Sequence, residues 1–64
     1  MEAHQQRVVD EKTELDEKLE KLNSFITSSP IFGELPTAEK NRLERQKVYM
    51  LLYSHVLQER IEAF

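Results

Sequence analysis

The residues that interrupt helices are confined to one short stretch of this chain. Its single glycine and both prolines, Gly33, Pro30 and Pro36, all lie between residues 30 and 36. Glycine and proline are the residues least compatible with the interior of an α-helix, and the residue before a proline is pushed out of helical backbone angles. The sequence therefore predicts a helix over residues 2–28, a loop over 29–36 and a helix over 37–63.

The first predicted helix has one apolar face. Its apolar residues follow one another in steps of seven, four, three and four, which is a heptad seam formed by Val8, Leu15, Leu19, Leu22 and Ile26. One apolar face requires one neighbouring helix. We therefore expect the two helices to pack against each other as an antiparallel hairpin.

The second predicted helix carries more apolar surface than one neighbour can cover. Residues 48–53 are all apolar or aromatic. One stripe is expected to face the first helix and consists of Leu43, Met50, Tyr53, Leu57, Ile61 and Phe64. A second stripe points elsewhere, and we expect it to contact another copy of the chain through Tyr49, Leu52, Val56 and the adjacent Val48.

The size of the chain also favours self-association. A domain of 64 residues has marginal stability on its own, and without cysteine it cannot form a disulfide. The expected fold is all-α: one domain over residues 1–64, an antiparallel helical hairpin that assembles into a helical bundle as a dimer or higher oligomer. The alternative is a monomer with exposed apolar residues, although large exposed apolar patches are uncommon on monomers.

Composition excludes several classes of partner. The net charge of -3 argues against binding to duplex nucleic acid, which requires a basic face. An apolar run of six residues is too short to cross a membrane, and the polar first ten residues do not resemble a signal peptide. The absence of cysteine fits a protein of the reducing cytoplasm.

No pattern of catalytic residues is present. The two histidines, His4 and His55, lie far apart in the sequence and have no further ligands at helical spacing. There is no glycine-rich phosphate loop, and no serine lies in a nucleophile motif. We expect no enzyme activity, no catalytic residue, no metal site and no cofactor.

Polar residues interrupt both apolar seams toward the open end of the predicted hairpin. Cations there could bind phosphate, amides could read a base edge, and aromatic rings could stack on a base. The predicted ligand-binding residues are His4, Gln5, Arg7, Lys12, Tyr49, Tyr53 and Arg60. The alternative is a purely structural role, in which Lys12 extends along apolar surface, Arg60 pairs with a glutamate and Gln5 sets the register.

The segment "HQQRVVDEKTELDEKLEKLNSFI" and the C-terminal pattern "YS.VL.ERI..F" resemble a family of short tailed-phage proteins. The resemblance covers nearly the whole chain and implies a protein that acts in the bacterial cytosol during infection. In its build, the family is similar to phage sponge proteins, which bind and sequester cyclic nucleotide signals of bacterial immunity. The implied ligand is a cyclic di- or trinucleotide, held without turnover.

A second function remains open, because a fold does not determine a function. The chain could be a small helical interaction module that binds and inhibits a host protein. Its contacts would then be Leu51 and the acidic face of the first helix, with Glu11, Glu14 and Asp16.

Overall fold

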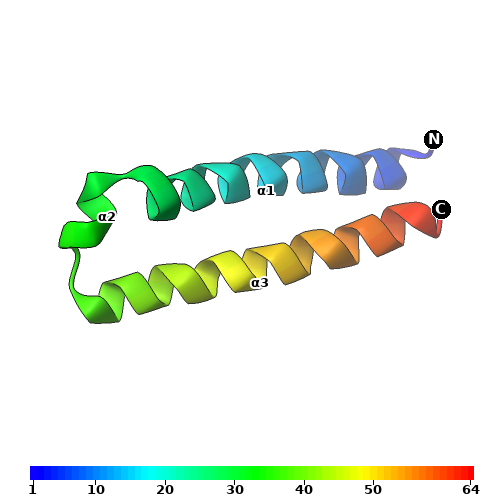
Figure 1. Cartoon of the computed structure of the whole chain (residues 1–64). Helices are drawn as coiled ribbons and strands as arrows, with labels where there is room; N and C mark the ends of the chain where they lie inside the picture. The colour runs from blue at the N-terminus through cyan, green and yellow to red at the C-terminus, as the bar shows by residue number, and fades with distance from the viewer.

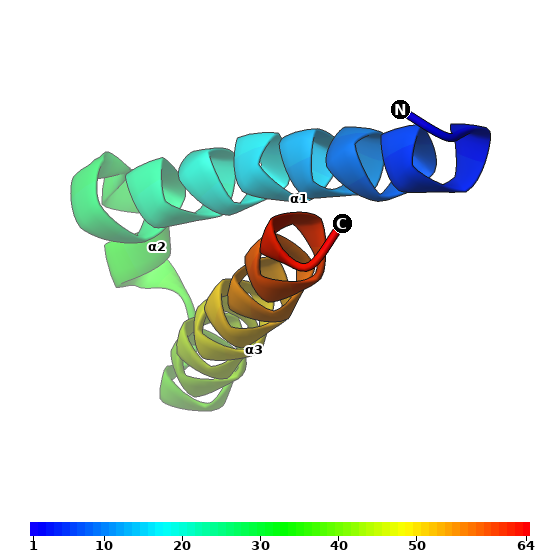
Figure 2. The same ribbon diagram turned by 90° about the vertical axis from the view of Figure 1, so that its right-hand side faces the viewer.

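The structure, a computed structural model, describes all 64 residues and contains three helices and no strand. Helix α1 spans Ala3–Ser28, α2 spans Pro30–Glu34 and α3 spans Thr37–Glu62. The long helices α1 and α3 lie side by side, with α2 at the turn and both termini at the opposite, open end (Figure 1). This arrangement confirms the predicted all-α hairpin. The two long helices are inclined to each other (Figure 2).

The connection between the long helices is folded, whereas a loop was expected over residues 29–36. The Ser29 side chain accepts a hydrogen bond from the backbone N–H of Ile31 at 3.2 Å, and Pro30 occupies the first helical position, where a missing N–H is tolerated. Phe32 packs edge-to-face on Phe25, with ring centroids 6.0 Å apart. Helix α2 therefore closes this end of the hairpin.

The face that α3 turns toward α1 differs from the predicted stripe. Between Leu43 and Ile61, its buried and half-buried residues follow in steps of four and three: Leu43, Lys47, Met50, Ser54, Leu57 and Ile61. Two residues predicted for this face, Tyr53 and Phe64, are 46 % and 48 % exposed. Because each residue is turned by about 100° from the previous one, Ser54 takes the inward position and Tyr53 lies on the flank.

The apolar core is very small. Only two hydrophobic residues are buried, Val8 of α1 and Leu57 of α3. The accessible surface is 4821 Å² for a 7.6 kDa chain, whereas a compact monomer of this mass exposes about 4300 Å². The chain is elongated, with extents of 46 × 15 × 13 Å.

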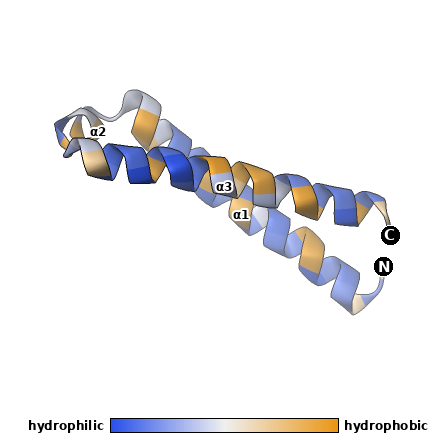
Figure 3. Cartoon of the chain, turned by 90° about the horizontal axis from the view of Figure 1, so that it is seen from below, coloured by the Kyte–Doolittle hydropathy of each residue, from blue (hydrophilic) through white to orange (hydrophobic).

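The outward face of α3 is apolar and has no partner within the chain. The residues predicted for an oligomer interface are all exposed: Tyr49, Leu52, Val56 and Val48. Seen from below, the middle of α3 is largely apolar (Figure 3). Large exposed apolar patches of this kind are uncommon on small monomers. Neither long helix combines the length and apolar character needed to cross a membrane.

Candidate ligand-binding groove

One flank of α3 forms an open groove that combines cations with aromatic rings. Its volume is about 400 Å³, and six side chains line it: Arg42, Arg45, Gln46, Tyr49, Met50 and Tyr53. All six come from α3, where spacings of three and four residues bring side chains to one side of a helix. The groove therefore requires only that α3 is helical over these residues.

The two arginines of the groove differ in how far they are engaged. Arg42 Nε donates a hydrogen bond to Glu39 Oε1 at 2.8 Å, whereas Arg45 has no ion pair within the chain. A guanidinium without a carboxylate partner keeps all its N–H donors available for an anion. Arg45 is thus the group of the groove that is most accessible to a phosphate.

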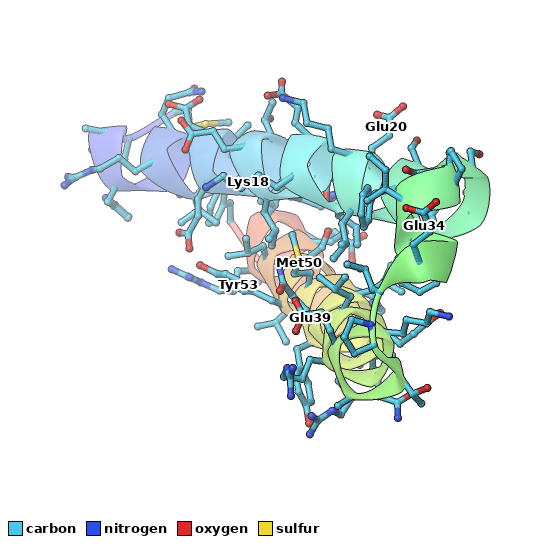
Figure 4. All side chains as sticks on the ribbon, turned by 90° about the vertical axis from the view of Figure 1, so that its left-hand side faces the viewer. Lys18, Glu20, Glu34, Glu39, Met50 and Tyr53 are labelled. Atoms are coloured by element: carbon cyan, nitrogen blue, oxygen red, sulfur yellow. The ribbon has the colours of Figure 1, made fainter.

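The tyrosine rings and the Gln46 amide form the rest of the groove with Met50. Tyr49 is 64 % exposed, so a planar ligand can reach its ring face. The Gln46 Nε2 lies 3.8 Å from Met50 Sδ, a weak contact that leaves the amide free to exchange partners. Met50 and Tyr53 project on the side of the hairpin where Lys18 extends from α1 (Figure 4). A further cation therefore lies on the same side as the groove.

Two other hollows lack this combination. One, of about 480 Å³, lies on α1 and is lined by Glu17, Glu20, Lys21 and Ser24, with no aromatic ring. The other, of about 370 Å³, lies across the helix seam and contains one cation, Lys47, beside the carboxylates of Asp16 and Glu20. Since carboxylates repel an anionic ligand, neither hollow suits a phosphate.

The residues predicted near the open end are distributed differently. His4 and Arg7 are exposed in the first turns of α1. Gln5 Oε1 accepts a hydrogen bond from the backbone N–H of Glu2 at 2.9 Å, and Lys12 Nζ lies 2.6 Å from Asp16 Oδ2. Gln5 and Lys12 thus contribute to the local structure of α1.

The structure brings together only two of the predicted ligand-binding residues, Tyr49 and Tyr53. Arg60 lies in the last turn of α3, two helical turns beyond Tyr53 and outside the groove. Arg42, Arg45, Gln46 and Met50 line the groove but were not predicted to bind a ligand. The signal in the sequence is the run Arg42, Arg45, Tyr49, Tyr53, in steps of three, four and four.

A polar cluster lies inside the seam between α1 and α3. Asp16 Oδ1 accepts a hydrogen bond from Ser54 Oγ at 2.5 Å, while Asp16 Oδ2 contacts Lys12 Nζ at 2.6 Å. These donors, Lys12 first and Ser54 second, hold the pKa of the Asp16 carboxyl below its ordinary value. No group of three His, Cys, Asp or Glu side chains is arranged to hold a metal ion.

Comparison with known proteins gives one assignment. No curated protein and no solved structure matches the chain. One family model, described as Sequestin, matches residues 2–63. Because this match covers almost the entire hairpin, including the groove and the outward face of α3, the chain belongs to the Sequestin family.

Proposed function

We propose that this protein is a phage anti-defence protein that binds and sequesters a cyclic nucleotide signal of bacterial immunity, without turnover. The family name, Sequestin, points to sequestration of a ligand. The single observation that carries the proposal is the α3 groove, where the unpaired guanidinium of Arg45 lies beside the rings of Tyr49 and Tyr53. These groups match the two parts of a nucleotide, its phosphate and its base.

Each part of the groove has a role in this function. Arg45 and Arg42 bind phosphate through charge-assisted hydrogen bonds. Tyr49 or Tyr53 stacks on a base, which contributes roughly 1–3 kcal/mol, and the Gln46 amide is placed to donate to and accept from a base edge. The alternative location for the same ligand is the open end of the hairpin, with the cations and amides of His4, Gln5, Arg7, Lys12 and Arg60.

The affinity required for sequestration limits how the ligand is held. Binding at nanomolar concentration corresponds to about -12 kcal/mol. Exposed ion pairs contribute little because water and salt screen them. A groove on one side of a single helix therefore needs a second surface to enclose the ligand, and the unpartnered face of α3 is adjacent to it.

The test is direct binding of a panel of cyclic di- and trinucleotides, measured by isothermal titration calorimetry. We expect nanomolar binding of at least one member. Heat denaturation of the complex should then release the ligand intact, because the protein does not turn it over. Absence of binding across the panel would contradict the proposal, and release of a cleaved product would indicate an enzyme instead.

The alternative function is a protein-interaction module that inhibits a host protein. It is favoured by the exposure of Leu51 and Leu52, at 48 % and 59 %, because a helix with an open apolar face can pack on another protein. Purification of the tagged chain from expressing bacteria should then recover one host protein in stoichiometric amount. Recovery of the chain alone from cells in which it is active would contradict this alternative.

A further inference from the structure

On the outward face of α3, the residues before Leu52 are complementary to the residues after it. Five exposed residues lie on this face, at positions symmetric about Leu52: Arg45, Val48, Leu52, Val56 and Glu59. Read in either direction from Leu52, the face shows a valine four residues away and a charged residue seven residues away. The two charges have opposite sign. An antiparallel partner of the same sequence would match this pattern.

The pattern fixes a register for a second copy. When two α3 helices pack antiparallel about a two-fold axis at Leu52, each Val48 faces a Val56 and each Arg45 faces a Glu59. Arg45 has no ion pair within the chain. Glu59 contacts His55 at 2.9 Å, and its side chain remains 62 % exposed, so a second cation has access to it. The pairing covers the apolar centre and adds two ion pairs. A guanidinium has five N–H donors, so Arg45 can pair with Glu59 of the second copy through one edge and keep its other edge for a phosphate in the groove.

The same register brings a third arginine to each groove. At about 100° per residue, Arg42, Tyr49 and Arg60 lie on one flank of the face, roughly 60–80° round from Leu52. A two-fold axis perpendicular to both helices places this flank of one copy and the same flank of the other copy on one side of the dimer. Arg60 of the second copy then comes alongside the groove, between the positions of Arg42 and Arg45.

From this juxtaposition we propose that two copies pack antiparallel through α3 about Leu52, and that each ligand groove is completed by Arg60 of the other copy. The pairing of the helices stands on the sequence pattern and the exposure of the face. The assignment of Arg60 to the groove deepens the proposed function and rests on it. It gives the predicted ligand-binding role of Arg60 a location, in the groove of the other copy and outside the groove of its own chain.

The pairing can be tested without ligand by charge reversal. Arg45→Glu alone places two glutamates opposite each other, and Glu59→Arg alone places two arginines opposite each other. Each variant alone should self-associate about tenfold more weakly than the unmodified protein, or worse. An equimolar mixture of the two should recover the dimer, because both pairs are then of opposite charge. Sedimentation velocity at several concentrations measures both effects.

Recovery in the mixture also shows that both variants fold. Variants that dimerise alone as well as the unmodified protein, or a mixture that stays dissociated, would overturn the proposed register. The matched control is Lys21→Glu on the exposed side of α1, which reverses a charge away from the face and should leave the dimer unchanged.

The shared groove can be tested by complementation, with calorimetric titration of the cyclic nucleotide that binds the unmodified protein best. Arg60→Ala and Tyr53→Ala should each weaken binding by about tenfold or more. In their mixed dimer, the intact groove of the Arg60→Ala chain meets Arg60 of the other chain. Random mixing makes about half of the dimers mixed, and each mixed dimer has one complete groove of its two. About one site in four should therefore bind tightly again. No restoration would overturn the shared groove. Absence of binding by the unmodified protein would overturn the proposed function. The pairing of the two α3 helices would then still be tested by the charge-reversal variants, which need no ligand.

Discussion

Ser54 of α3 donates a hydrogen bond to Asp16 of α1, and no other side-chain hydrogen bond joins the two long helices. Asp16 also accepts from Lys12 one turn earlier. The pair lies in a seam that is otherwise mostly apolar. Sliding α3 by one turn would remove Ser54 from a half-buried carboxylate while the apolar contacts could re-form. We infer that this pair selects the register of the hairpin, as single polar residues do in coiled coils.

Ser54→Ala should therefore destabilise the hairpin. The substitution removes a donor from Asp16 and leaves the backbone unchanged, which typically costs about 1 kcal/mol. Urea unfolding followed by circular dichroism measures the change in the free energy of unfolding. Ser24→Ala, on the exposed side of α1, is the control and should have little effect. Equal stability of the two variants would show that the bond to Asp16 does not contribute.

The stability of the protein should fall on acidification partly because of Asp16. Hydrogen bonds from Lys12 and Ser54 lower the pKa of this carboxyl in the folded state. The unfolded state consequently binds a proton first, so this stabilisation is present above the unfolded pKa and is lost as pH falls through the folded pKa. Asp16→Asn should flatten the dependence of the free energy of unfolding on pH as the pH falls through and below the ordinary aspartate pKa of about 4.

The other carboxylates titrate in both proteins, so the difference between the two curves isolates Asp16. Since the Asp16 side chain is 41 % exposed, the difference should be modest and should shrink at high salt. Parallel curves for the unmodified protein and Asp16→Asn would contradict the lowered pKa.

The hairpin was predictable because its signals are local. Confinement of Gly33, Pro30 and Pro36 to one stretch defined two helices, and the heptad seam of α1 gave them facing surfaces. The inward face of α3 was less predictable, since Ser54 is polar and only the presence of Asp16 opposite makes it suitable for a seam. The large aromatic ring favours Tyr53 over the hydroxyl of Ser54 at that point, although Tyr53 is 46 % exposed.

The candidate site was predictable only in its aromatic half. Tyr49 and Tyr53 were expected from their ring chemistry, whereas Arg42 and Arg45 are indistinguishable in sequence from ordinary surface cations. What separates the arginines is the pairing of Arg42 with Glu39 and the lack of any such partner for Arg45. The spacing already distinguishes the two: Arg42 has Glu39 three residues before it, whereas Arg45 has no acidic residue three or four positions away on either side.

Leucines on the two faces of α3 should respond differently to truncation. Leu57 is fully buried, so Leu57→Ala should cost about 2–5 kcal/mol at any protein concentration. Leu52 is 59 % exposed in the single chain, so Leu52→Ala should lower stability mainly through the dimer. Its effect should then grow with protein concentration. Urea unfolding at 2 concentrations about 100-fold apart separates the two cases. An effect of Leu52→Ala that does not depend on concentration would argue against self-association through this face.

Gly33→Ala should stabilise the connection. Gly33 lies in helix α2 with no positive φ, and a Cβ added there would meet no atom within 4 Å. Alanine reduces the conformational freedom of the unfolded chain and should stabilise the protein by about 0.4–1 kcal/mol. Thermal unfolding measures the gain. A loss of stability would show that the end closed by Phe32 and Phe25 requires the flexibility of glycine.

The two locations considered for the ligand can be separated by matched pairs of variants. Arg42→Ala with Arg45→Ala removes both cations of the groove, whereas Arg7→Ala with Lys12→Ala removes two cations of α1 toward the open end. Each double variant loses the same net charge, so a general electrostatic effect on an anionic ligand should be equal in both. Direct phosphate contacts should appear as an additional loss in only one of them.

We expect the groove variant to bind the best cyclic nucleotide of the panel at least about 100-fold more weakly than the unmodified protein, since two charge-assisted contacts are lost. The variant of the open end should lose about tenfold or less, and most of that loss should disappear at high salt, because screening removes long-range attraction before it removes direct contacts. Calorimetric titration at low and high salt, at a protein concentration at which both variants are dimeric by sedimentation velocity, measures both effects. The opposite ranking would place the ligand at the open end of the hairpin, with His4 and Arg7, and would leave the α3 groove without a role in binding.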